Sequence, residues 1–313
     1  MDLISIIVAV FSIIGSVLGA GFMTGTEIYG FFARFGSIAY ITIAINCVVF
    51  GLFIVIYSIK NAKNEIFGFE NHQKNYILYF CQLLITGTMV AGVCTLLTDF
   101  GVTRLWATPI ILLFVFVCNL VGIRSANFVN VIVTCFACVS FLFVAYDGNW
   151  QPLGESKTLV IPLFMVGFYL IMNMASSEAV VKSACVGKKK LQIWMIGLLV
   201  GLMLMIMLYT LVGLATHGDM PLILIIKNTW FKKVYSVIVL MAMVSTMLSS
   251  AFGAKRLFNL NNLCSSFFVA IIACIVSFVG FKNLIFYVYP FIGTLLAIKY
   301  IFGGLIKFAE KKA

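Results

Sequence analysis

Charged residues are scarce in this sequence. Only 10% of its 313 residues are Asp, Glu, Lys or Arg, whereas 63% are hydrophobic. A water-soluble globule of this size needs far more polar side chains to cover its surface. The composition therefore excludes a soluble globular protein and places the chain in lipid.

Catalytic and metal-binding patterns are missing as well. The sequence has no H-E-x-x-H motif, no nucleophile elbow and no paired aspartates inside an apolar run. Its two histidines, His72 and His217, lie far apart in the chain. Cys135 and Cys138 form a C-x-x-C pair, but no second ligand pair accompanies them. We therefore expect no enzymatic activity, no cofactor and no bound metal other than Na+.

What the sequence does contain is a series of apolar runs. Each has about 18 or more residues, the length that a helix needs to cross a hydrocarbon core of roughly 30 Å. The first run starts at Leu3 and exceeds the length of a signal-peptide core, so we expect it to remain as the first span. The ten predicted spans are 3–34, 37–59, 75–99, 105–123, 125–147, 158–182, 191–216, 230–254, 263–280 and 283–306.

The formal net charge of +11 is explained by membrane topology rather than by a nucleic-acid partner. With the N-terminus inside, thirteen Lys and Arg residues fall in cytoplasmic gaps between spans and seven in external gaps. Cytoplasmic loops are typically the more basic ones. We expect a multi-pass protein of the cell (inner) membrane, with both termini in the cytoplasm. The sequence leaves its oligomeric state open.

The spans predict an internal repeat. Each span of the first half starts 154 to 158 residues before its counterpart five spans later. Because five is an odd number, the second unit enters the membrane from the opposite side, and the repeat must be inverted. The predicted units are a first five-helix repeat at 1–147, an external connector at 148–157, and a second repeat with a short cytoplasmic tail at 158–313.

Two spans contain residues that interrupt a helix at matching positions. The first span has four glycines within GSVLGAGFMTGTE (15–27), and the sixth has Asn173, Ser176, Ser177 and Glu178 within MNMASSEAVV (172–181). An unwound turn in a membrane leaves carbonyls and amides free to bind a ligand, and it is tolerated only against protein or a wet cavity. We predict that spans one and six are discontinuous and share a cavity. Close helix packing through small residues is the alternative.

Glutamates accompany both predicted interruptions. A carboxylate that faces lipid at the bilayer centre costs about 2.5 to 3.5 kcal/mol, so Glu27 should point into the bundle or lie near the external end of its helix. The same holds for Glu178, although Lys182 lies one turn later and can pair with it. We predict a coupling or gating role for both glutamates, with structural pairing as the alternative.

The eighth span carries hydroxyl groups on two neighbouring stripes. Ser245 and Ser249 lie four residues apart, as do Thr246 and Ser250. Hydroxyl oxygens beside free carbonyls suit a hard cation. The alternative is that these hydroxyls bond to carbonyls of their own helix. In the third span, Thr88 could line the same cavity, and helix packing explains it equally well.

The first span also carries a family resemblance. The GAGF-x-x-G-x-E run at 19–27, with Phe31, Phe32 and Gly36 after it, resembles the start of the YkvI-type bacterial membrane proteins. That family looks like a branch of the amino acid, polyamine and organocation (APC) transporter superfamily, which has the LeuT fold. The resemblance implies a secondary active transporter of a small solute, an amino acid or related zwitterion or organic cation, working by alternating access. Spans one, two, six and seven would rock against spans three, four, five and eight.

The resemblance implies site residues too. A sodium ion would bind the carbonyls of Gly15 and Leu18 and the hydroxyls of Ser245 and Thr246. Some proton-driven relatives carry a lysine on span five instead, and the absence of one inside this span favours Na+ over H+ coupling. The candidate substrate-binding residues are Gly19, Ala20, Gly21, Thr24, Thr88, Asn173 and Ser176. A ligand-sensing receptor subunit of the same fold, without a transport cycle, is the alternative function.

Overall fold

The computed structural model describes residues 3–62, 76–121, 126–148, 150, 153–154, 158–215, 218, 220–258 and 260–310. Within these ranges the chain is helical and contains no strand. In the described part of the chain, six helical stretches are long and apolar enough to cross a membrane: Ile38–Ile59, Tyr76–Asp99, Val160–Ser177, Lys190–Val212, Thr229–Leu257 and Phe281–Lys299. Four shorter apolar helices accompany them: Leu3–Val17, Trp106–Val117, Val131–Asp147 and Asn262–Ser277. The chain is an all-α, multi-pass membrane protein.

Every predicted span coincides with a helix or a short series of helices, and most boundaries agree within a few residues. The larger helices are α1 (Leu3–Val17), α4 (Ile38–Ala62), α5 (Tyr76–Asp99), α6 (Arg104–Val121), α7 (Ala126–Asp147), α8 (Val160–Cys185), α9 (Lys190–Val212), α11 (Thr229–Ala254), α12 (Asn262–Ser277) and α14 (Tyr289–Glu310). The short elements are α2 (Ala20–Thr24), α3 (Thr26–Phe31), η1 (Ala33–Phe35), α10 (Pro221–Leu224), η2 (Lys255–Leu257), α13 (Phe281–Asn283) and the π-helical turn η3 (Leu284–Val288).

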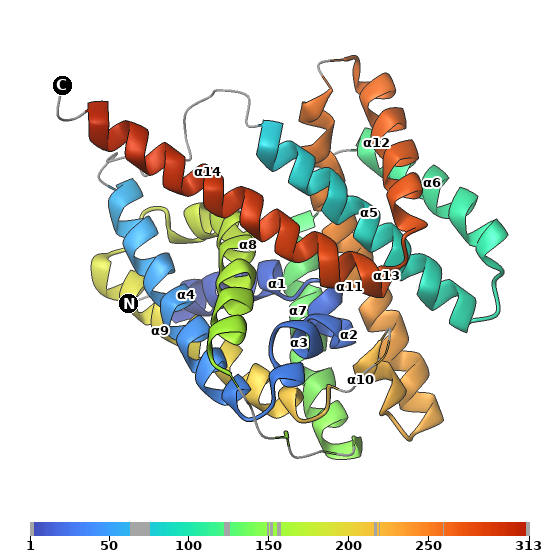
Figure 1. Cartoon of the computed structure of the whole chain (residues 1–313), viewed down its shortest axis with the longest axis horizontal. Helices are drawn as coiled ribbons and strands as arrows, with labels where there is room; N and C mark the ends of the chain where they lie inside the picture. Colours follow the sequence, from blue (N-terminus) through green and yellow to red (C-terminus); the bar gives the residue numbers. More distant parts are fainter. Residues whose placement is uncertain are drawn as a thin grey trace.

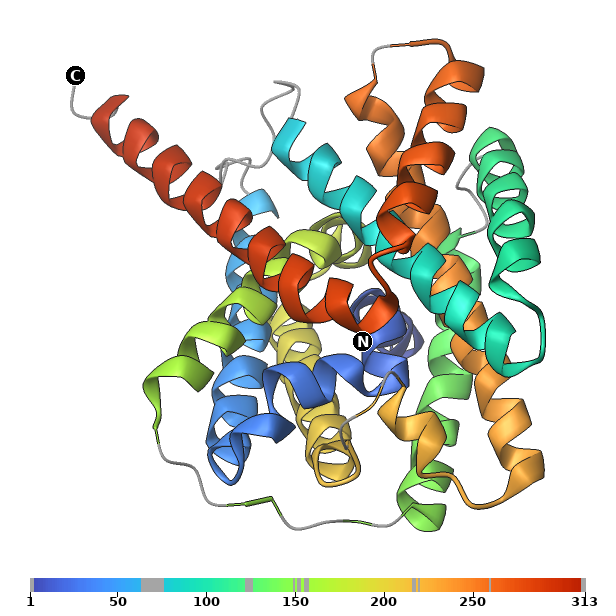
Figure 2. The ribbon, with the colours of Figure 1, turned by 45° about the vertical axis from the view of Figure 1, so that its right-hand side comes forward.

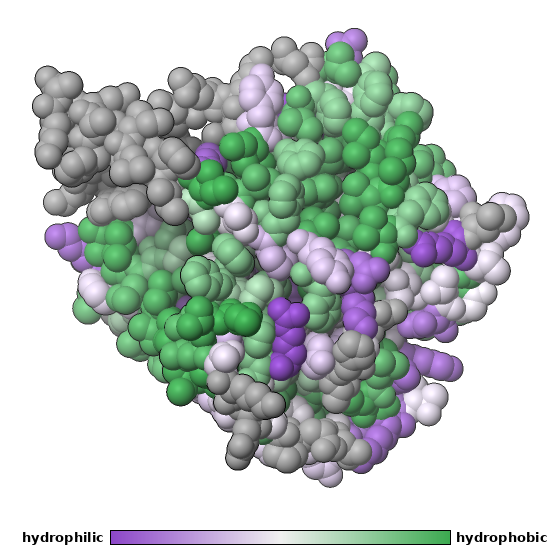
Figure 3. Space-filling model, in the orientation of Figure 1, coloured by the Kyte–Doolittle hydropathy of each residue, from purple (hydrophilic) through white to green (hydrophobic). Residues whose placement is uncertain are grey.

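Large apolar side chains cover much of the surface, as a lipid environment requires. Ile4, Leu142, Phe164, Leu191 and Phe278 are among those that point outward from the helices. Figure 3 shows apolar surface over most of the visible face, with hydrophilic residues concentrated toward one side. Contiguous apolar surface of this extent marks contact with a membrane rather than with water.

The long helices pack in two groups. In the first group, α4 packs on α8 and α9, and α1 packs on the same two helices. In the second, α5 packs on α6, α11 and α12, and α12 also packs on α6. Figure 1 shows α4, α8 and α9 on one side of the molecule and α5, α6, α11 and α12 on the other. The short helices α2 and α3 lie between the groups, and α7 contacts both α1 and α11.

Helices that are five predicted spans apart contact each other directly. Four such pairs pack together: α1 with α8, α4 with α9, α5 with α11, and α6 with α12. The second group of helices, including α5, α6, α11 and α12, is seen together in Figure 2. Two units related by a twofold axis bring their equivalent helices together where the axis passes. These contacts place each of the eight helices beside the helix that the predicted repeat makes its counterpart.

The first span is interrupted. Helix α1 ends at Val17, Leu18 and Gly19 are not helical, and α2 starts at Ala20. Gly25 has a positive φ of 81°, and α3 starts directly after it. Glycine adopts this left-handed conformation without the steric cost that a side chain would add. The glycines of the first span thus give it two breaks.

The prediction that the sixth span is discontinuous is wrong. Helix α8 runs from Val160 to Cys185 through the whole 172–181 segment. Its polar side chains bond to the preceding turn: Asn173 Nδ2 donates to the Tyr169 carbonyl at 2.9 Å, and Ser177 Oγ donates to the Asn173 carbonyl at 2.7 Å. Side chains that bond to carbonyls three or four residues back are compatible with a continuous helix.

Only residues 148, 150, 153 and 154 of the predicted connector 148–157 fall within the described ranges. The Gly154 carbonyl accepts a hydrogen bond from the Ser37 amide, 2.8 Å away, just before α4 begins. This bond holds the segment between the predicted repeats against the start of the second span.

Candidate functional site

The break at Leu18 and Gly19 leaves backbone groups without partners. The Gly19 amide donates to the Val17 carbonyl at 2.7 Å instead of to Gly15, and the Met23 amide donates to Gly19 at 3.0 Å. Among the described residues, the carbonyls of Gly15 and Leu18 therefore accept no backbone hydrogen bond, and the amides of Gly21 and Phe22 find no acceptor. Unpaired backbone groups inside a membrane protein are costly unless a ligand or water binds them.

The space beside the break is open on one side. An added Cβ at Gly19 would have no heavy atom within 4 Å, apart from its chain neighbours. Leu18, by contrast, is buried. The unwound segment is thus packed at Leu18 and has room for a further group beside Gly19.

The second break of the first span, at Gly25, is tightly covered. An added Cβ at Gly25 would lie 2.6 Å from Leu222 Cγ of α10, and α10 packs on α2. Thr24 Oγ1 donates to the Gly21 carbonyl at 3.2 Å and lies 2.9 Å from Thr26 Oγ1. The buried Thr24 hydroxyl thus helps to hold the turn between α2 and α3.

Glu27 is folded back over Gly21. An added Cβ at Gly21 would lie 2.5 Å from Glu27 Cγ and 2.6 Å from Cδ. Residues six apart on a regular helix are about 240° apart around its axis, so they do not meet. The left-handed turn at Gly25 is what brings them together, and it leaves the Glu27 side chain only 3% exposed.

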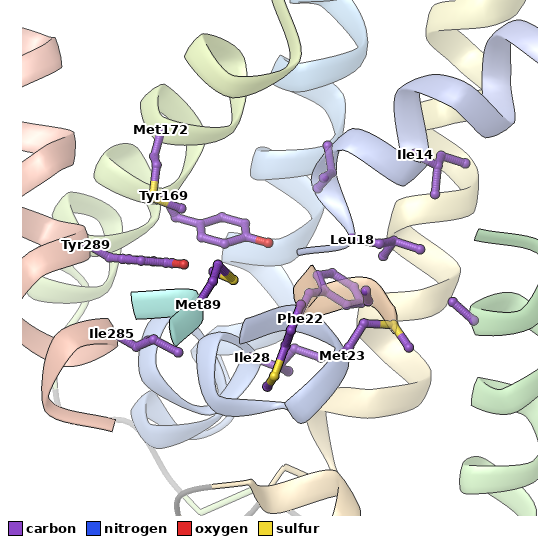
Figure 4. Close-up of a cluster of buried hydrophobic side chains, with 14 of the residues drawn as sticks. Ile14, Leu18, Phe22, Met23, Ile28, Met89, Tyr169, Met172, Ile285 and Tyr289 are labelled. Atoms are coloured by element: carbon purple, nitrogen blue, oxygen red, sulfur yellow. The ribbon is translucent and has the colours of Figure 1, made fainter. Parts of the chain in front are cut away.

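Two tyrosines from distant segments adjoin the Glu27 carboxylate. Tyr169 of α8 and Tyr289 at the start of α14 both interact electrostatically with it. In Figure 4 their hydroxyls point away from their own helices, toward the interrupted first span. The rings of Phe31 and Phe32 pack on Tyr169, with centroids 5.1 and 5.4 Å away. The site is therefore a carboxylate and two phenols with aromatic surroundings.

The other candidate substrate-binding residues differ in burial and in their hydrogen bonds. Asn173 is buried one turn after Tyr169, whereas Ser176 is exposed and its hydroxyl donates to the Asn173 carbonyl. Thr88 is buried in α5 and donates to the Leu84 carbonyl at 3.0 Å. Ala20 lies in α2 and Glu178 in α8, and the side chains of both lie outside the part of the chain that the structure describes.

The candidate ion-site hydroxyls lie on α11, which packs on α2. Ser245 is buried, and Thr246 Oγ1 donates to the Ala242 carbonyl at 3.0 Å. Tyr235, on the same helix, donates to the Met23 carbonyl at 2.5 Å. This buried bond fixes α2 to the helix that carries the two hydroxyls.

Sequence reasoning missed the three tyrosines, Tyr169, Tyr235 and Tyr289. Each lies in an apolar run of the sequence, where an aromatic side chain is typical of the hydrophobic core. The signal that could have found them is the hydroxyl itself, because a buried tyrosine hydroxyl usually has a polar partner.

Among the described residues, no group of three or more His, Cys, Asp or Glu side chains is arranged to hold a metal ion. Comparison of the sequence with models of known protein families and with curated proteins gave no match. The geometry of the break and of the Glu27 cluster is therefore the basis for assigning a function.

Proposed function

We propose that the protein is a secondary active transporter of a small solute. The observation that carries the proposal is the break in the first span, which leaves two carbonyls and two amides without backbone partners beside an open space. In a membrane helix with only a structural role, the loss of these backbone hydrogen bonds would cost free energy without any compensating interaction. Transporters use such interrupted helices to bind solutes near the bilayer midplane.

The helix packing supports a ten-span, LeuT-like arrangement of two inverted repeats. Equivalent helices pack in four pairs, and the first group of helices corresponds to the predicted moving spans one, two, six and seven. The second group shares α5, α6 and α11 with the spans predicted to stay fixed, but it includes α12, and α7 contacts both groups. In the proposed cycle, the broken first span moves with α4, α8 and α9 against α5, α6, α7 and α11. The interruption is confined to the first span, so α8 contributes side chains to the site rather than free backbone.

Sodium is the proposed coupling ion. The Gly15 and Leu18 carbonyls are unpaired, and the buried Ser245 belongs to the helix that packs on α2. Carbonyl and hydroxyl oxygens are ligands that hard cations prefer. These two carbonyls with the Ser245 and Thr246 hydroxyls would hold the ion, and its binding would stabilise the unwound segment.

The proposed cargo is an amino acid or a related zwitterion or organic cation. The free amides of Gly21 and Phe22 are donors suited to a carboxylate. Gly19 offers the space next to them. The similarity of the first span to YkvI-type proteins of the APC superfamily favours the same class of cargo, and we place the protein in the cell membrane with both termini in the cytoplasm.

Uptake by proteoliposomes that contain the purified chain tests the proposal. Radiolabelled amino acids are supplied with an inward Na+ gradient, with an inward proton gradient, and with neither. We expect at least one amino acid to accumulate with the Na+ gradient and not without it. Accumulation of no amino acid under any gradient would rule out this function.

The same assay separates transport from the alternative, a ligand-sensing receptor subunit of the same fold. A receptor would bind an amino acid in detergent without accumulating it in vesicles. Measuring equilibrium binding beside uptake, on the same preparation, therefore distinguishes the two functions.

A further inference from the structure

We propose that Glu27 binds the ammonium group of the cargo. The ammonium group would donate one hydrogen bond to the Glu27 carboxylate and one to each of the Tyr169 and Tyr289 hydroxyls. This inference rests on the proposed function, and it narrows the cargo to solutes that carry a primary ammonium group. It also assigns Glu27 to cargo binding rather than to structural pairing.

The position of Glu27 is the first support. Its side chain is buried, and no described Lys, Arg or His side chain offers it a charge partner. A charged carboxylate in such a place costs several kcal/mol unless it takes up a proton or gains a cationic partner. A cation supplied by the cargo offsets this cost each time the site is filled.

The glycine beneath Glu27 is the second support. The carboxylate rests directly on the backbone of Gly21, whose amide is one of the two free donors. The ammonium and carboxylate of an α-amino acid are attached to the same carbon. A carboxylate beside a free amide therefore matches the charge arrangement of this class of solute.

The tyrosines are the third support. They come from α8 and α14, which pack on each other, and their exposed fractions are 2% and 3%. The Tyr169 hydroxyl has a hydrogen bond to the Asn173 side chain, whereas the Tyr289 hydroxyl has none to a described residue. Both groups interact electrostatically with Glu27, and a phenol oxygen has a second lone pair that can accept a further bond. An ammonium group has three N–H donors, which match one carboxylate and two phenol oxygens.

A metal ion fits this cluster less well than an ammonium group. Calcium takes six to eight oxygen ligands, and Mg²⁺ demands octahedral geometry. Glu27 is the only carboxylate that the described residues bring to the cluster, and they contain no group of three or more His, Cys, Asp or Glu side chains that could hold a metal ion. Aromatic rings such as Phe31 and Phe32 stabilise organic cations through their faces. The chemistry therefore favours an ammonium group.

Matched probes test the inference on the full-length protein. Equilibrium binding in detergent is measured for alanine, leucine, putrescine and propylamine. Each is compared with its hydroxyl analogue: lactate, 2-hydroxy-4-methylpentanoate, butane-1,4-diol and propan-1-ol. We expect at least one amine to bind, and its hydroxyl analogue to bind at least about 100-fold more weakly, since the buried carboxylate then stays unpaired.

Variants locate the contact. Glu27→Gln should weaken amine binding about 100-fold or more, and Tyr169→Phe and Tyr289→Phe about tenfold each. The matched control is Tyr209→Phe, because the Tyr209 hydroxyl instead donates to the Tyr40 carbonyl at 2.8 Å. The control should bind like the native protein. Thermal unfolding of each variant shows whether it is folded.

Each outcome bears on one of the two proposals. Equal binding of the amines and their hydroxyl analogues, native affinity in folded Glu27→Gln, or no binding of any amine would overturn the ammonium site. Uptake that persists in Glu27→Gln would overturn it while leaving transport intact. Amine binding that depends on Glu27 but is never followed by uptake would support the ammonium site and reject transport.

Discussion

Replacing Gly21 by alanine is expected to slow transport at least about tenfold while leaving the protein folded. The new Cβ would lie 2.5 Å from Glu27 Cγ and 2.6 Å from Cδ, so the glutamate side chain must move away. Because the atoms that must yield belong to the end of a flexible side chain, the fold can adapt. The carboxylate, however, leaves its place beside the break and the two tyrosines. Uptake should fall at least about tenfold, since a displaced buried charge loses about 2 kcal/mol or more of its interaction.

The measurement is proteoliposome uptake beside thermal unfolding. The control is Gly167→Ala in α8, where an added Cβ meets no heavy atom within 4 Å. The melting temperature of Gly21→Ala should stay within about 3 °C of the native value. Native uptake by Gly21→Ala would show that the carboxylate does not need its position over Gly21.

Replacing Gly51 by alanine is expected to destabilise the whole bundle. An added Cβ at Gly51 would lie 2.8 Å from the Gly197 carbonyl oxygen, and one at Gly197 would lie 2.7 Å from the Gly51 carbonyl oxygen. Helices α4 and α9 thus touch backbone to backbone, as small residues allow in membranes. No side chain can yield here, so the helices themselves must separate. Overpacking of this kind costs about 1 to 3 kcal/mol.

Thermal unfolding of the purified protein checks this second prediction. Gly51→Ala should lower the melting temperature by about 5 °C or more. The same substitution at Gly167 is again the matched control, and it should leave the melting temperature unchanged or raise it, since alanine favours a helix over glycine. Equal melting temperatures for the two variants would contradict the close contact between α4 and α9.

The break in the first span could be predicted because glycine determines the backbone directly. Gly25 adopts a positive φ, and Gly19 has an extended conformation directly before α2. The equivalent prediction for the sixth span failed because Asn173, Ser176 and Ser177 have side chains that bond to their own helix. Both polar residues and glycines interrupt an apolar run in the sequence. Of the two, only glycine lacks the Cβ that restricts the backbone, so only glycine favours a break in the helix.

The arrangement around Glu27 lay beyond sequence reasoning. The sequence predicts that a carboxylate in this span avoids lipid, but not that it lies over Gly21, because that contact depends on the turn at Gly25. Tyr169 and Tyr289 reach it from segments that are far away in the chain. Only the packing of α8 and α14 brings them to the first span. The apolar runs, by contrast, predicted the helices themselves, since helix length follows from membrane thickness.

The central claim is that the first span is unwound beside a water-accessible site while its counterpart, α8, is continuous. Backbone hydrogen exchange of the full chain in lipid nanodiscs, resolved by mass spectrometry, tests it most directly. We expect peptides from 15–27 to exchange at least about 100-fold faster than peptides from 172–181, because the amides of Gly21 and Phe22 have no backbone acceptor. Equally slow exchange in both segments would contradict the account.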